Sequence, residues 1–110
     1  MSHRITTKTQ MINKNLATSA LEMAGLSYTE EGASVLRITS GGLRNATINL
    51  TNGDVVGDTD YHGRGTLGAL RKFYSEAQIR ERCQLEGHTI EDRQVLQDGR
   101  IRLVCSGMFA

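Results

Sequence analysis

The sequence predicts an α+β fold, a two-layer sandwich in which two helices pack on one face of a largely antiparallel sheet. Short segments rich in β-branched residues alternate apolar with polar side chains and are separated by glycines, which is typical of antiparallel hairpins. Two longer segments place apolar residues at helical spacing. No proline, repeat or low-complexity linker interrupts the chain, so we expect a single domain over residues 1–110 with the order β-α-β-β-β-β-α-β-β.

The first two elements are expected to be a strand and a helix. Residues 2–11, SHRITTKTQM, alternate in a way that favours an extended strand. Asn13 is a suitable N-cap for the helix, and Gly25 stands where a left-handed residue commonly ends one. The apolar stripe between them consists of Leu16, Ala17, Ala20, Leu21 and Ala24.

Two further strands are expected over residues 26–32 and 34–40, joined through Gly32. The second of them pairs with the strand that follows. Placing Leu36 opposite Leu50 keeps the apolar faces of the two strands together.

A tight turn is expected after that pair, because Asn52-Gly53 is a strong signal for a two-residue hairpin loop. Such a loop sets Leu50 opposite Val55. Residues 41–45, GGLRN, are then left as a five-residue loop between the two preceding strands.

The second helix is expected over residues 66–86. Its apolar stripe consists of Leu67, Leu70, Phe73, Tyr74 and Ala77. Ser75 with Gln78 has the spacing of a capping box, at which the helix would restart and bend, and Gly87 ends it.

The last two strands are expected to form a hairpin. Residues 89–97 and 100–108 have strand-like patterns and flank the Asp-Gly pair at 98–99. A two-residue loop at that pair sets Leu96 opposite Ile101.

Composition argues against several classes of function. The formal net charge is only +1, so the broad basic surface of a DNA- or RNA-binding protein is not expected. Cys83 and Cys105 lack C-x-x-C or Cys/His ligand spacing, which predicts reduced, buried, inert thiols and no cofactor. No apolar run approaches the roughly 20 residues of a membrane-spanning helix. We therefore expect a cytoplasmic protein without nucleic-acid or membrane partners.

Segments at both ends of the chain resemble the hypothetical chloroplast reading frame thirty-five family, found in plastids and cyanobacteria and with phage-encoded relatives. They are MSHRITTKTQ followed by LATSALEMAG, and LRKFYSEAQIRERCQLEG followed by DGRIRLV. The family is one of unknown function, so the resemblance implies a fold and no catalytic residues. The middle segment NGDVVGDTDYHGRGT lacks the tryptophan of plastid-type members and is similar to the phage-type members.

Residues 57–66, GDTDYHGRGT, concentrate chemically useful side chains just before the second predicted helix. We expect a glycine-rich crossing whose backbone N–H groups, with the helix N-terminus and Arg64, surround an anion. Arg44, in the loop 41–45, adds a second guanidinium if the two loops meet. The predicted ligand-binding residues are Arg44, Asp58, Asp60, Tyr61, His62, Gly63, Arg64 and Gly65.

Other interpretations of this stretch remain open. It is also typical of an ordinary strand-to-helix connection, and it matches neither of the common phosphate-binding fingerprints. Asp58 and Asp60 near His62 have the composition of a metal or acid–base site. Because no further ligand spacing is recognisable, we expect neither a metal nor catalytic residues.

These observations favour a small non-enzymatic binding protein that captures an anionic ligand, above all a nucleotide. In this hypothesis the two arginines bind phosphate, Gly63 and Gly65 donate backbone hydrogen bonds, Tyr61 stacks on a base and an aspartate binds ribose. A phage-type protein would sequester a host signalling nucleotide in the host cytoplasm. The alternative is an interaction module that acts through its sheet face, an edge strand or homo-oligomerisation, without a small ligand.

Overall fold

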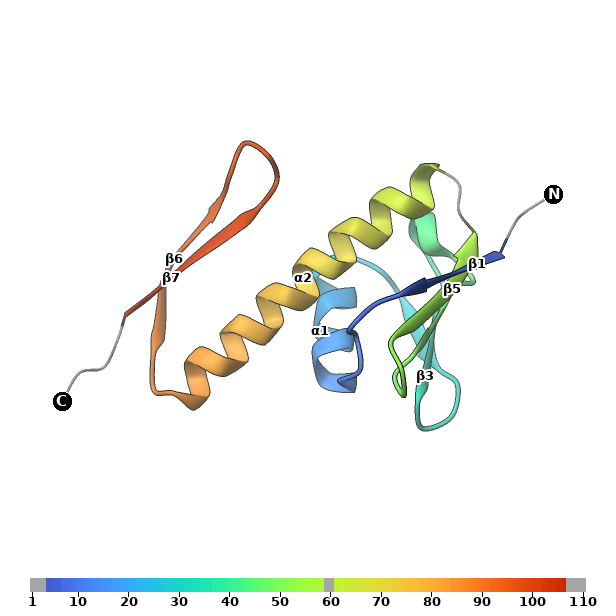
Figure 1. Ribbon diagram of the computed structural model, residues 1–110, viewed down its shortest axis with the longest axis horizontal. Coiled ribbons are helices and arrows are strands. Elements are labelled where there is room, and N and C mark those ends of the chain that lie inside the picture. The colour runs from blue at the N-terminus through green and yellow to red at the C-terminus, as the bar shows by residue number, and fades with distance from the viewer. Residues whose placement is uncertain (1–3, 59–60, 107–110) are drawn as a thin grey trace. The chain divides into compact units, whose positions relative to one another are not determined.

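The computed structural model describes residues 4–58 and 61–106 (Figure 1). Within them, the predicted α+β fold and the predicted order of strands and helices are confirmed. The elements are β1 (Arg4–Lys8), α1 (Lys14–Met23), β2 (Tyr28–Glu30), β3 (Val35–Ile38), the short 3₁₀ helix η1 (Gly41–Leu43), β4 (Thr47–Asn49), β5 (Asp54–Asp58), α2 (Tyr61–Leu85), β6 (Thr89–Val95) and β7 (Ile101–Ser106). The chain divides into two compact units, Met1–Tyr74 and Ser75–Ala110, and the single domain expected from the sequence stays a prediction.

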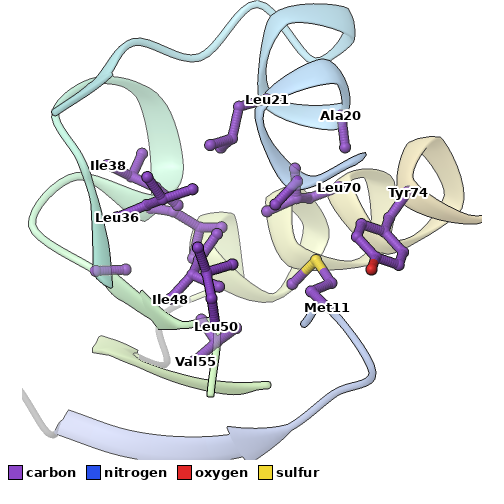
Figure 2. Close-up of a cluster of buried hydrophobic side chains, with 13 residues drawn as sticks. Met11, Ala20, Leu21, Leu36, Ile38, Ile48, Leu50, Val55, Leu70 and Tyr74 are labelled. Atoms are coloured by element: carbon purple, nitrogen blue, oxygen red, sulfur yellow. The ribbon is translucent and has the colours of Figure 1, made fainter. Parts of the chain in front are cut away.

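The first unit contains a five-stranded antiparallel sheet in the order β1-β5-β4-β3-β2. Leu36, Ile48 and Val55 stand side by side on its inner face, and none is more than 2% exposed. Leu21 of α1 and Leu70 of α2 belong to the same buried cluster, which Figure 2 shows in close-up. Apolar residues of both helices, up to Tyr74 of α2, therefore pack with one face of this sheet, as the two-layer prediction requires.

The register of the sheet differs by two residues from the sequence prediction, which was wrong on this point. Ile48, rather than Leu50, lies opposite both Leu36 and Val55. Because side chains alternate between the two faces of a strand, an even shift leaves the same residues facing the core. Leu50 is accordingly still buried.

The turn between β4 and β5 explains this shift. The Gly53 N–H donates to the Asn49 carbonyl oxygen at 2.7 Å, which closes a turn wider than a two-residue hairpin loop. The Asn49 side chain also accepts from the Thr51 N–H, and the Asn52 side chain from the Asp54 N–H, both at 2.9 Å. Local side-chain bonds of this kind favour the wider turn over the tight one.

Residues 41–45, expected as an open loop, instead contain the helix η1. The apolar side chain of Leu43 is the physical reason, because it is only 4% exposed and belongs to the core. Gly41, the first residue of η1, and Asn45, two residues after its end, adopt left-handed φ angles of 73° and 72°. The Asn45 N–H then donates to the Ile38 carbonyl oxygen at 2.7 Å, which returns the chain to the sheet.

Both predicted ends of α1 are confirmed. The Asn13 side chain accepts a backbone N–H of the first turn at 3.1 Å, and its own N–H donates to the Tyr74 hydroxyl of α2 at 3.2 Å. Gly25 has a left-handed φ of 72°, and the Leu26 N–H donates to the Leu21 carbonyl oxygen at 2.9 Å. This is the Schellman arrangement, which satisfies carbonyl groups at a helix C-terminus.

The outer face of the five-stranded sheet is polar. Lys8 and Asp54 form an ion pair there, with 3.2 Å between Nζ and Oδ1. The outward row that crosses all five strands consists of Thr29, Arg37, Thr47, Val56 and Thr6. An antiparallel sheet with one polar face is stable in water, so this face requires no covering layer.

The second unit joins the last part of α2 to a two-stranded antiparallel ribbon formed by β6 and β7. Its loop has three residues, because the Leu96 N–H donates to the Arg100 carbonyl oxygen at 2.8 Å and Gly99 has a φ of 86°. Val95, and not Leu96, therefore lies opposite Ile101. The predicted hairpin is confirmed, but it lacks the two-residue loop on which the pairing of Leu96 with Ile101 depended. A shift of one residue reverses which face each side chain occupies.

Helix α2 is continuous from Tyr61 to Leu85, so it neither starts at residue 66 nor restarts at Ser75. Glycines in its first turns resemble a loop in the sequence, although each costs only about 1 kcal/mol in a helix. Packing of Leu70 and Tyr74 into the core favours the helical form of the segment before them.

Replacement of Gly65 by alanine tests this helix start. A Cβ at Gly65 meets nothing within 4 Å, so Gly65→Ala should raise the free energy of unfolding by about 0.5–1 kcal/mol in urea denaturation. Gly87→Ala is the control: its Cβ is equally uncrowded, but its φ of 77° should make alanine destabilising. A loss of stability in Gly65→Ala similar to that in Gly87→Ala would contradict a helical Gly65.

Candidate functional site

The structure places only part of the predicted ligand-binding set. Asp60 lies outside the described residues, as do the side chains of Asp58, Tyr61 and His62. Their proposed contacts with ribose or a base therefore stay predictions.

Residues 61–66, predicted as part of a glycine-rich loop before the second helix, lie in helix α2, so this part of the prediction was wrong. Gly63, Arg64 and Gly65 lie in the first turns of α2, because the helix begins at Tyr61. Arg64 and Gly65 are exposed. An anion at this position would meet the start of a helix and one guanidinium instead of a loop that wraps around it.

Arg44 lies at the C-terminal end of η1, in the same compact unit as Arg64. It is exposed, and its Nε donates to the Thr39 carbonyl oxygen at 3.2 Å, which orients the guanidinium along its own loop. The meeting of Arg44 and Arg64 around one ligand stays a prediction.

A buried carboxylate in the second unit is a feature that the sequence did not reveal. Glu76 of α2 is only 2% exposed. Arg93 of β6 donates from Nε to its Oε2 at 3.0 Å and from Nη2 to its Oε1 at 3.1 Å. Arg80, one turn along α2, donates from Nε to Oε2 at 2.9 Å. The i,i+4 spacing of Glu76 and Arg80 was visible in the sequence, whereas the contact with Arg93 depends on the fold.

Arg93 and Arg80 stabilise the negative charge of Glu76. Burial raises the pKa of this carboxyl, but the hydrogen bonds from Arg93 and Arg80 outweigh burial, so that the net effect lowers the pKa. The carboxylate stays ionised, and both of its oxygens are occupied. This arrangement joins β6 to α2 and leaves no lone pair directed at a substrate, so we interpret it as structural.

The two cysteines, expected to be inert thiols, are neighbours in the structure. Cys83 of α2 and Cys105 of β7 are both free, with 2.6 Å between their sulfur atoms. Among the residues that the structure describes, no group of three or more histidine, cysteine or acidic side chains is arranged to hold a metal ion. In the same residues, no helix combines the length and apolar character needed to cross a bilayer.

Comparisons with protein-family models, with curated proteins and with solved structures find no match. The resemblance to the chloroplast reading frame family accordingly stays a prediction from the sequence. The geometry of the chain alone must therefore support any proposed function.

Removal of the Glu76 charge should lower the stability of the second unit and should make that stability less sensitive to acidic pH. We expect Glu76→Gln to lower the free energy of unfolding by about 1–3 kcal/mol at neutral pH, because two guanidinium groups lose their buried partner. Since the pKa of Glu76 is lower in the folded state, its contribution is complete above the ordinary glutamate value of about 4.3 and is lost as pH falls through the folded value.

Urea denaturation at several pH values, followed by far-UV circular dichroism, measures both effects. Glu81→Gln is the matched control, because it removes the same charge from an exposed position on the same helix. Equal losses in the two variants, or an unchanged acid response in Glu76→Gln, would contradict the structural role of Glu76.

Proposed function

We propose that this protein is a non-enzymatic interaction module that associates with a second copy of itself through the β6–β7 ribbon. The observation that carries the proposal is that the ribbon has no buried core of its own. From Thr89 to Cys105, no residue is fully buried, and six of the seven positions of β6 are exposed.

The apolar content of the ribbon supports this proposal. Half-buried side chains line it at Ile90, Leu96, Ile101, Leu103 and Val104. Val95 is 63% exposed. A two-stranded ribbon is marginally stable by itself, and three or more strands are usually needed to form a stable layer. Additional strands from another chain would bury these side chains.

The edges of the ribbon offer a way to add those strands. Among the described residues, β6 and β7 pair only with each other, so each has an outer edge without strand partners. Exposed edges of this kind pair readily with a further strand. A second copy supplies the same edge in the opposite direction, so two copies can pair around a two-fold axis. The polar outer face of the five-stranded sheet offers no comparable apolar surface.

Size-exclusion chromatography with light scattering tests the proposal. We expect the wild type to be a dimer at high concentration and Val95→Lys to weaken the dimer at least about tenfold, or ~1.4 kcal/mol, because a charge on the ribbon opposes strand addition. Gln97→Lys is the matched control, since it adds the same charge in the exposed loop of the ribbon. A wild type that stays monomeric, or equal weakening by both variants, would contradict self-association through the ribbon.

Nucleotide capture is a second candidate, and one observation favours it. Arg44 and Arg64 are both exposed, and among the side chains that the structure describes neither is paired with a carboxylate. Exposed guanidinium groups that are not paired with a carboxylate are suited to bind phosphate. The first turns of α2 add backbone N–H groups near Arg64.

A thermal-shift screen with linear and cyclic nucleotides at about 1 mM tests this candidate. A bound nucleotide should raise the melting temperature by about 4 °C or more, and Arg64→Ala should abolish the rise. Arg71→Ala is the control, because it removes an exposed arginine further along the same helix. If no nucleotide changes the melting temperature of the wild type, this candidate is excluded.

A further inference from the structure

The second unit contains two thiols in direct contact, and burial of the cysteines alone does not require this contact. The sulfur atoms of Cys83 and Cys105 are 2.6 Å apart, although these residues are 22 positions apart in the chain. This separation is only roughly half an ångström longer than a disulfide bond of about 2.05 Å. Both residues belong to one compact unit, so their proximity is a property of that unit.

A metal site does not explain this pair. Zinc bound by thiolates is almost always held by three or four protein ligands. Within the described residues, no third histidine, cysteine or acidic side chain completes such a set around the two sulfurs. Two thiols in contact are, however, the arrangement from which an intramolecular disulfide forms with little backbone movement.

We propose that Cys83 and Cys105 are a reversible dithiol–disulfide site, oxidised by small-molecule disulfides of the glutathione type. This inference does not rest on self-association through the ribbon. It concerns the contact between α2 and β7 within one chain, and it holds whether the protein is a monomer or a dimer.

The two cysteines have different roles in the reaction. Cys105 is half-buried, whereas Cys83 is only 8% exposed. The hydrogen bond with Cys105, together with burial, raises the pKa of the Cys83 thiol. Cys105 is therefore the thiol that meets a reagent from solution, and Cys83 is the thiol that resolves the product.

The exchange takes two steps, in which atoms and electrons balance. The Cys105 thiolate attacks one sulfur of the small disulfide, forms a mixed disulfide and releases one small thiolate. Cys83 then loses its proton and attacks the Cys105 sulfur, which forms the Cys83–Cys105 bond and releases the second small thiolate. The protein loses two electrons and two protons, and the small disulfide is reduced to two thiols once the thiolates are protonated.

The bond would matter because the ribbon has no core of its own. It would tie β7 covalently to the last turn of α2 at Cys83, in addition to the contact of Glu76 and Arg93 that joins β6 to the same helix. Closing the chain between the two cysteines removes conformations of the unfolded segment, so the oxidised form should unfold and be cleaved less readily.

Mass spectrometry of the full chain in reduced and oxidised glutathione tests the site. We expect the oxidised wild type to lose two hydrogen atoms, to retain no glutathione and to yield one peptide pair joined through Cys83 and Cys105. Cys83→Ser should retain one glutathione on Cys105, because no resolving thiol is present. Cys105→Ser should react much more slowly, because Cys83 is buried.

Thermal unfolding supplies a second readout that does not depend on the variants. Oxidation should raise the melting temperature of the wild type by about 5 °C or more, and reductant should reverse the rise. Glutathione retained by the wild type, disulfides between chains, or equal reactivity of the two single variants would overturn the proposal. The wild type alone shows whether the oxidised product is the linked peptide pair or a glutathione adduct. The test therefore remains decisive even if a variant fails to fold.

Discussion

The first unit depends on the packing of both helices with one row of buried side chains, which consists of Leu36, Ile48 and Val55. Each of the three central strands contributes one residue to this row, and Leu21 and Leu70 complete the buried cluster. No strand pair or helix of this unit buries its apolar face alone. The polar outer face follows from the same constraint, because alternation turns every neighbour of a buried residue toward solvent.

Features set by short-range chemistry could be predicted from the sequence. The order of elements, the cap at Asn13 and the left-handed Gly25 follow from residues within one or two turns of each other. The inner faces of β3, β4 and β5 in the five-stranded sheet were also predictable, although the register was not. Even shifts preserve faces, so the apolar pattern allowed both the predicted register and the observed one.

Features set by contacts between distant segments could not be predicted in the same way. The helical state of the glycine-rich stretch depends on the packing of Leu70 and Tyr74, which a loop-like local composition conceals. Burial of Glu76 depends on Arg93, in a strand that follows the helix. For the candidate site the sequence identified exposed arginines, but it placed Arg64 in a loop that the structure shows as a helix. The pairing of the cysteines gave no spacing signal at all.

Helix α2 belongs to both units, and this has a consequence for how the molecule opens. Its first part is anchored in the core by Leu70 and Tyr74, whereas β6 and β7 are attached to its last turns through polar and sulfur contacts. We expect strands attached in this way to open locally at a lower free-energy cost than the five-stranded sheet. Their amide protons therefore exchange with solvent by local opening, while those of β3 and β4 must wait for cooperative disruption of the sheet.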